Sequence, residues 1–193
     1  HYPLRRQRQM CIRDRYYMIF GGVPYYWGFL KKGLSLSQNI DSILFEKDAP
    51  LRDEFKYLYA SVFKKPENYV KIIEALGTKK VGMTREEIIT ATKIPNSGDL
   101  TTKLEELESC GFIRKYNAFG MKKKNAIYQL MDCFTLFYFK FLKSEQTDEH
   151  FWTNQINTPA VNTWLGLAFE RVCMEHVDCL LYTSPSPRDP KTS

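Results

Sequence analysis

The order of helical and strand patterns between residues 71 and 132 constrains the fold of this chain more than any other feature. The segment MTREEIITATKI begins its helix at Thr84 and carries Glu87 three residues later, a capping box that predicts a helix N-terminus. After the turn IPNSGD, the segment LTTKLEELESCGF places three leucines on one stripe of a second helix, namely Leu100, Leu104 and Leu107. The segment FIRKYNAFGMKKKNAIYQLMD alternates on both sides of a glycine-containing turn, as a β-hairpin does. Helix, helix, turn, helix and hairpin is the order of a winged helix, which we predict over residues 71–132.

The residues before this segment show helical periodicity. Apolar residues recur at intervals of three and four after Ser37 and again after Pro50, in the second case as Leu51, Phe55, Leu58, Tyr59 and Phe63. Pro66 opens a further helical pattern, YVKIIEALG, in which Gly77 is a typical C-cap. We therefore predict a helical bundle over residues 16–70, within a mainly α-helical chain.

The residues after the hairpin also indicate helices. The stretch CFTLFYFKFL is densely aromatic, which predicts a buried helix that links to the segments following it. The stretch WLGLAFERVCMEHV begins a new amphipathic helix with one apolar face, formed by Trp164, Leu167, Ala168 and Val172. Because no later segment before residue 178 can cover that face, we expect residues 133–177 to hold a linking helix and the start of a truncated C-terminal domain.

The two ends of the chain differ from its middle. RRQRQMCIRDR near the start is strongly basic, and CLLYTSPSPRDPKTS at the end carries three prolines and no apolar periodicity. Both can be written in codons that resemble the two transposase adapters used to build sequencing libraries. We therefore interpret residues 1–15 and 178–193 as adapter-derived and expect them to be disordered. The alternative is a natural basic arm and a natural linker tail.

The net charge of the middle part is small. The formal charge of the whole chain is +6, but residues 16–177 carry 21 Lys and Arg against 19 Asp and Glu, a net charge near +2. A field strong enough to steer polyanions is therefore not expected from composition.

Other residue types limit the class of protein further. Three separated cysteines in the middle part favour reduced core thiols and a cytoplasmic location over a disulfide framework: Cys110, Cys133 and Cys173. His150 and His176 have no Cys or second His at ligand spacing, so no metal site is predicted. The stretch YYMIFGGVPYYWGFL is too short and too interrupted to span a bilayer of ~30 Å, so no membrane partner is expected.

The segment GGVPYYWGFL is the first motif that points to a function. Glycine lets a backbone approach a flat ring, and proline suits the first turn of a helix because it has no N–H to leave unpaired. The segment resembles a motif in the helical lid of P-loop ATPases of the AAA-like and signal-transduction classes, where such a turn lies against adenine. The resemblance implies that Gly21, Gly22 and Pro24 form the adenine side of a nucleotide site. Taken alone, the motif favours a plain helix-breaking turn.

The order of the whole middle part extends this resemblance. A lid-like bundle after GGVP, a winged helix, an aromatic helix and GLAFERVC are similar to the C-terminal part of an archaeal and bacterial ATPase family. Its members join a P-loop domain to a winged helix and to a C-terminal domain resembling the PD-(D/E)XK nucleases. The resemblance covers nearly all of residues 16–177. It implies that ATP is the cofactor of a full-length protein, in which this fragment couples nucleotide state to an effector and contacts an ATPase domain and a nuclease-like domain.

The catalytic half of that family has no counterpart in this sequence. A phosphate-binding loop needs GxxxxGK[ST], and the nearest stretch, GTKKVGMT, has Met83 where the lysine belongs. We therefore expect the chain to bind ATP weakly and not to hydrolyse it alone, and we predict no catalytic residue. Glu170 matches an acidic residue of the nuclease-like domain by resemblance, and without downstream carboxylates we expect it to be an exposed helix charge.

The predicted winged helix raises the question of DNA binding. The helix after the turn would expose mainly acidic and small polar residues, namely Asp99, Thr101, Thr102, Lys103, Glu105, Glu106 and Glu108. The hairpin, or wing, carries residues that suit phosphate contacts without sequence readout, namely Arg114, Lys115, Lys122, Lys123 and Lys124. We favour a winged helix used for intramolecular or protein contacts. Non-specific DNA contact and a stand-alone winged-helix transcriptional regulator stay open as alternatives.

Overall fold

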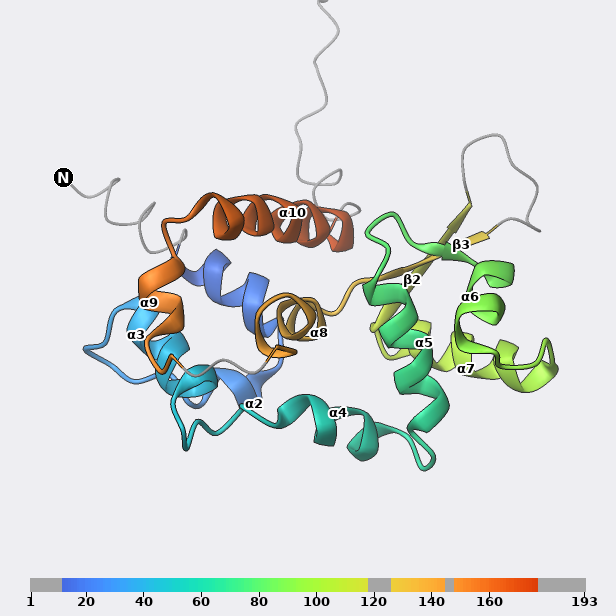
Figure 1. The fold of residues 1–193 in the computed structure, drawn as a ribbon, viewed down its shortest axis with the longest axis horizontal. Helices are drawn as coiled ribbons and strands as arrows, with labels where there is room; N and C mark the ends of the chain where they lie inside the picture. The colour runs from blue at the N-terminus through green and yellow to red at the C-terminus, as the bar shows by residue number, and fades with distance from the viewer. Residues whose placement is uncertain (1–11, 118–125, 145–147, 177–193) are drawn as a thin grey trace, which may run out of the picture.

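The chain folds into two groups of elements, with α4 and α8 between them (Figure 1). The computed structural model describes residues 12–117, 126–144 and 148–176. Within these ranges the chain is mainly helical and forms one three-stranded antiparallel sheet. The prediction of a mainly α-helical chain with a small β-hairpin is therefore confirmed.

The first group begins with a helix over residues 12–20. The boundary expected after residue 15 therefore falls inside a helix, and residues 1–11 lie outside the described ranges. A π-helical segment, η1, continues α3 without a break. The elements that follow it, up to the connection with the second group, are α2 (Pro24–Trp27), α3 (Leu36–Ile40), η1 (Asp41–Phe45) and α4 (Glu54–Val62).

Helix α3 begins with a capping box. The Gln38 N–H donates to Ser35 Oγ at 3.3 Å, and the Ser35 N–H donates to Gln38 Oε1 at 2.9 Å. Two backbone donors that a helix start would leave unpaired are satisfied in this way. The spacing Ser35-x-x-Gln38 was a readable signal for this start, but the sequence analysis did not use it.

The second group holds the sheet. Its elements are α5 (Glu67–Gly77), β1 (Met83–Thr84), α6 (Arg85–Thr92), α7 (Gly98–Ser109), β2 (Ile113–Asn117) and β3 (Ala126–Leu130). The predicted capping box of α6 is confirmed, because the Glu87 N–H donates to Thr84 Oγ1 at 3.3 Å and the Thr84 N–H donates to Glu87 Oε2 at 2.8 Å. The leucine stripe of α7 is buried as predicted. Helix α5 runs across residue 71, where the sequence analysis placed a domain boundary.

The sheet has the strand order β1-β3-β2. Strands β2 and β3 form the predicted antiparallel hairpin, with Ile113 opposite Leu130. Strand β1 was not predicted from the sequence. Gly82, just before it, has φ +87°, and a Cβ at this position would lie 2.5 Å from the Tyr128 carbonyl oxygen. Only glycine therefore lets the chain come this close to β3.

The last elements return to the first group. They are α8 (Cys133–Phe137), η3 (Tyr138–Leu142), α9 (Phe151–Gln155) and α10 (Pro159–Glu175). The predicted aromatic helix is α8 with its π-helical continuation η3. The Asp132 carboxylate caps it, because Oδ2 accepts from the Thr135 N–H at 2.7 Å.

A buried carboxylate ties α9 to η1. Asp41 is 1% exposed, and its two oxygens accept from the Trp152 N–H at 2.7 Å and the Thr153 N–H at 3.0 Å. The Thr153 hydroxyl donates to the same carboxylate at 2.5 Å. Asp41 thus satisfies the N-terminal N–H groups of α9, a helix far from it in the sequence.

The apolar face of α10 is covered by earlier parts of the chain. Trp164 packs edge to face against Phe137, with ring centroids 5.4 Å apart, and against Phe141 at 5.3 Å. Trp164 and Ala168 are buried, whereas Leu167 and Val172 are half-buried. No later segment is therefore needed to cover this face, although the sequence pattern was interpreted as the start of a truncated domain. The cover comes from α8, η3 and α9, which precede α10 in the chain.

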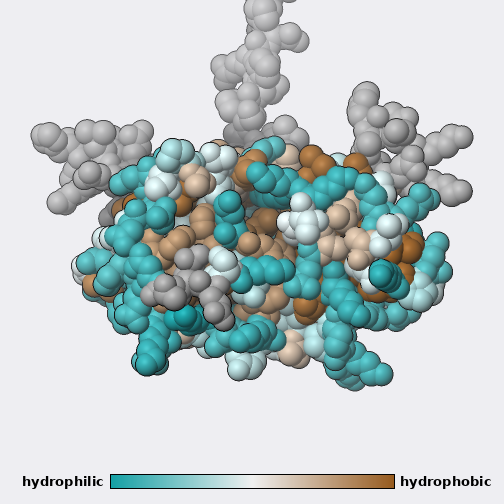
Figure 2. All heavy atoms as spheres, in the orientation of Figure 1, coloured by the Kyte–Doolittle hydropathy of each residue, from teal (hydrophilic) through white to brown (hydrophobic). Residues whose placement is uncertain are grey.

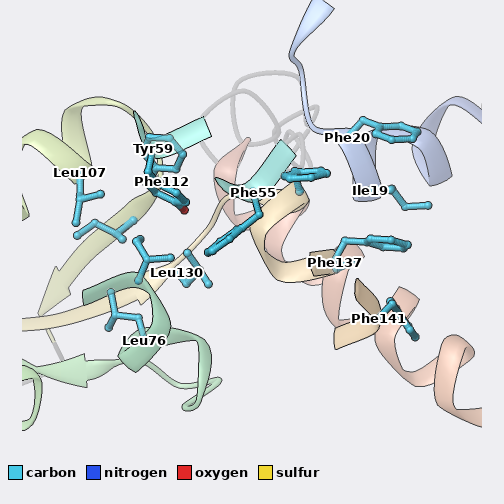
Figure 3. Packing of buried hydrophobic residues seen from close by; sticks show 14 of the residues in the cluster. Ile19, Phe20, Phe55, Tyr59, Leu76, Leu107, Phe112, Leu130, Phe137 and Phe141 are labelled. Carbon is cyan, nitrogen blue, oxygen red and sulfur yellow. The ribbon is translucent and has the colours of Figure 1, made fainter. Parts of the chain in front are cut away.

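One apolar cluster runs through both groups. Figure 3 shows Phe55 between Ile19, Phe20, Phe137 and Phe141 on one side and the residues around Leu107 on the other. The Phe55 ring stacks on Tyr138 at 4.0 Å and contacts Tyr59 at 5.4 Å, and Tyr59 contacts Phe112 at 4.9 Å. Aromatic residues of α4 therefore connect the two halves of the core.

Candidate functional site

The turn Gly21–Pro24 lies on the surface of the first group. Gly21 has φ +62°, a left-handed conformation that favours glycine, and its carbonyl accepts from Trp27 Nε1 at 2.9 Å. Gly22 is exposed, and a Cβ there would meet the Tyr17 ring at an ordinary 3.6 Å. Pro24 is exposed at the first position of α2, as expected from the sequence. The turn thus has a fixed backbone and an open outer face.

Beside this turn, the side chain of Tyr26 is buried, and those of Val23 and Tyr25 are exposed. Tyr26 is 2% exposed, and its hydroxyl donates to Glu54 Oε1 at 2.9 Å. Burial, reinforced by the Glu54 charge, raises the pKa of the Tyr26 hydroxyl, so it stays protonated as a donor. Val23 and Tyr25 are instead exposed, at 40% and 61%. Tyr26 therefore fixes α2 from beneath and leaves apolar surface next to the two glycines.

The two described basic residues of the wing have partners inside the molecule. Arg114 Nη1 donates to the Met174 carbonyl of α10 at 2.9 Å. The Lys115 ammonium lies 5.8 Å from the centroid of the Tyr128 ring, a cation–π distance. Lys122, Lys123 and Lys124 lie outside the described residues. Arg114 is therefore in contact with α10.

Helix α7 presents an acidic and small polar surface, as predicted. Asp99, Thr101, Thr102 and Glu105 are exposed, and Lys103, Glu106 and Glu108 are half-buried. Lys103 pairs with Asp99. Glu106 accepts from the Tyr69 hydroxyl, and burial together with this carboxylate raises the pKa of Tyr69 to about 12. The helix that would enter a DNA groove therefore carries the wrong sign of charge for phosphate contacts.

A cavity lies between the two groups of elements. Its volume is about 420 Å³, and its walls come from the end of α5, the loop after it, β2, β3, the α8–η3 helix and α10. Figure 2 shows brown atoms of hydrophobic residues among hydrophilic ones near the middle of the visible face, between the two groups that Figure 1 shows. Glu170 is exposed, as expected, and lies on the wall of this cavity.

Three side chains hold the loop that borders the cavity. Arg171 Nη2 donates to the Lys80 carbonyl at 2.7 Å, and its Nη1 donates to the Leu130 carbonyl. Gln129 Nε2 donates to the same Lys80 carbonyl at 2.8 Å, and the Tyr116 hydroxyl donates to the Val81 carbonyl at 2.7 Å. The loop, the sheet and α10 are thereby fixed relative to one another. The site was not predicted from the sequence, because its residues come from segments that are far apart in the chain.

The described ranges hold neither a metal-binding cluster nor a membrane-spanning helix. Residues 12–117, 126–144 and 148–176 contain no group of three His, Cys, Asp or Glu side chains placed to hold a metal ion. No helix within them combines the length and the apolar character needed to cross a membrane.

Comparison with known proteins gave no relative. No family model matches the chain, and no curated protein and no solved structure matches it. A function for this chain can therefore be inferred only from its own residues and their geometry.

Proposed function

We propose that this chain is part of an ATP-binding protein of the AAA-like class, in which it couples nucleotide state to an effector. The observation that carries the proposal is the exposed turn at Gly21–Pro24. Gly21 takes up φ +62°, Pro24 begins α2, and the outer face of the turn is open. A flat adenine ring can approach such a backbone because Gly22, Val23 and Pro24 are exposed.

The second part of the proposal is that α5 to β3 form a winged helix. The element order α5, β1, α6, α7, β2, β3 supports this, and so does the strand order β1-β3-β2. Arg85 fixes the turn between α6 and α7, because its Nε donates to Asn96 Oδ1 at 2.9 Å and its Nη2 to the Ser97 carbonyl at 3.0 Å.

This winged helix is better suited to contacts within the protein than to reading DNA. Helix α7 is acidic on its exposed side, and Arg114 of β2 is bonded to α10. The stretch from Gly77 to Thr84 lacks the phosphate-loop lysine and leads from the end of α5 into β1. In the proposed division of roles, the chain supplies the adenine side of the site, and a separate ATPase domain supplies the phosphate side.

A nucleotide titration followed by NMR tests the adenine site. Millimolar ATP is expected to shift the amide signals of Gly21, Gly22 and Val23, with weak affinity because the phosphate contacts are missing. Gly21→Ala should remove these shifts. Gly33→Ala is the matched control, because Gly33 also has positive φ, at +91°, but lies outside the turn. Micromolar affinity by calorimetry would contradict the division of roles, and unchanged turn signals at saturating ATP would contradict the adenine site.

A DNA-binding measurement tests the alternative, a transcriptional regulator. If the wing touches DNA only through phosphates, replacing Lys122, Lys123 and Lys124 by Ala should weaken binding equally for all sequences and flatten its salt dependence. Sequence-selective binding that survives the triple substitution would overturn the proposed role of the winged helix.

A further inference from the structure

We propose that the cavity beside α10 binds a small amphipathic carboxylate with an aromatic or acyl body. Its volume of about 420 Å³ lies in the range of cavities that enclose small organic ligands. This site is separate from the Gly21–Pro24 turn, and the proposal does not depend on the nucleotide role.

The walls of the cavity are mainly apolar. Leu136 and Phe139 line it from the α8–η3 helix, and Trp164, Leu167 and Ala168 line it from α10. Burial of an aromatic or acyl group against this surface is favourable by roughly 25 cal/mol per Å² of apolar area removed from water. The walls therefore fit the apolar body of the ligand.

The frame around the cavity is rigid, so the space does not close by local collapse. Arg171, Gln129 and Tyr116 bond the carbonyls of Lys80 and Val81, as described above. At the other side, α5 and η3 are in close contact, because a Cβ on Gly77 would lie 2.6 Å from the Phe139 ring. A preformed cavity costs a ligand less ordering than one that must open.

The charges on the cavity wall select an anion. Lys80 and Lys140 line it, and in the described part of the chain neither ammonium group has a salt-bridge partner. Two nearby lysines outside the cavity do form salt bridges: Lys79 pairs with Glu87 at 2.5 Å, and Lys143 pairs with Glu74 at 3.2 Å.

Two other charged residues line the cavity. Among the described residues that line the cavity, Glu170 is the one carboxylate, and Arg171 is a cation whose N–H groups bond backbone carbonyls. Among the described lining residues, cations outnumber carboxylates, and this net positive charge suits a carboxylate ligand.

Calorimetric titrations of the full chain with matched probes test the proposal. The carboxylates 1-naphthoate and octanoate represent the aromatic and acyl bodies, and 1-naphthalenemethanol and octanol are their uncharged counterparts. We expect at least one carboxylate to bind about tenfold more tightly than its alcohol, because a charge-assisted contact is worth more than a neutral one. The better-binding pair identifies the body that the cavity prefers.

Substitutions locate the binding to this cavity. The double variant K80Q/K140Q should lose the preference for the carboxylate, whereas K79Q/K143Q, which changes two paired lysines outside the cavity, should keep it. Leu167→Trp should weaken binding of all probes, because the larger side chain takes up part of the space. Circular dichroism melting curves verify that each variant is folded.

Three results would overturn the proposal. They are equal affinity for acid and alcohol, a carboxylate preference unchanged in K80Q/K140Q, and no binding of any probe at millimolar concentration. If Leu167→Trp fails to fold, the smaller change Ala168→Leu replaces it, and unchanged affinity in that variant would place the ligand elsewhere.

Discussion

The two groups of elements have cores of different chemistry, and this difference decides how regular each one is. The group from α5 to β3 is built mainly on aliphatic residues such as Ile72, Ile88 and Leu104. The other group, which we call the aromatic group, holds the helix over residues 12–20, α2, α3, η1, α8, η3, α9 and α10. It is richer in rings, and Phe137 alone contacts Phe45, Phe141, Trp152 and Trp164. In the described ranges, both π-helical segments lie in the aromatic group.

Ring packing explains this contrast. Aliphatic side chains fill the space between regular helices, so α7 keeps a single periodic stripe of Leu100, Leu104 and Leu107. Aromatic rings prefer edge-to-face or offset contacts at particular separations, and the backbone must place each ring accordingly. An extra residue in a π-helical turn shifts the following side chains around the helix axis. The aromatic group therefore depends on contacts between distant segments.

The largest expected effect comes from removing a ring at the centre of the aromatic group. Phe137→Ala should lower the free energy of unfolding by about 3–5 kcal/mol, because it deletes a fully buried ring and leaves a cavity. Leu104→Ala is the counterpart in the aliphatic group, with an expected loss of about 2–5 kcal/mol. Urea denaturation measures both. A loss below about 1 kcal/mol for Phe137→Ala would break the comparison, since it would show that neighbouring rings refill the space.

The next effect concerns the polar contact that holds the aromatic group together. Both carboxylate oxygens of Asp41 now accept hydrogen bonds from Trp152 and Thr153. The Asp41→Asn side chain has a single oxygen, so at least one of these donors loses its partner. We expect a loss of about 1.5–3 kcal/mol in the free energy of unfolding. The control is Asp48→Asn, at an exposed position, with an expected change within about 0.5 kcal/mol. Equal effects of the two substitutions would show that Asp41 does not anchor α9.

Helix capping should affect both groups alike, because it is a local interaction. Thr84→Ala in the aliphatic group and Ser35→Ala in the aromatic group each remove a capping box. Each is expected to lower the free energy of unfolding by about 1 kcal/mol. Thermal melting followed by circular dichroism measures both. A much larger loss for Ser35→Ala would indicate that the aromatic group also depends on this local start.

The smallest effects concern two exposed carboxylates, one in each group. The pKa of Glu87 is lowered by a hydrogen bond from Lys79 and by another from the Thr84 N–H. The pKa of Asp148 is lowered by a hydrogen bond from Asn154 and by another from the His150 N–H. A lowered folded-state pKa means that the stability contribution is present above the unfolded pKa and is lost as pH falls through the folded pKa. NMR titration between pH 7 and pH 2 should show both groups titrating below their ordinary values. Lys79→Gln should raise the Glu87 pKa and leave that of Asp148 unchanged; if Glu87 does not respond, the ion pair is absent in solution.

The sequence predicted the aliphatic group better than the aromatic one. The cap at Thr84, the stripe on α7 and the β2–β3 hairpin follow from local periodicity and turn residues, and the structure confirms them. Strand β1 has only two residues and exists through its pairing with β3, so no local pattern marks it.

The aromatic group and the candidate sites depended on contacts that periodicity does not encode. The bond from Asp41 to α9 and the cover over Trp164 join segments that are far apart in sequence. The exposed turn at Gly21–Pro24 was found from its residues, because glycine and proline have local backbone preferences. The cavity was not, because Lys80 and Lys140 approach it on different elements.

Helix α10 has a mechanical consequence for the whole molecule. Its first half is seated on the aromatic rings through Trp164, and its last turns are bonded to the sheet and its neighbouring loop through Arg171 and Arg114. A helix of 17 residues is a stiff rod on this scale. Helix α10 therefore joins the two groups by side-chain contacts at both of its ends, in addition to the two covalent connections from α4 to α5 and from β3 to α8.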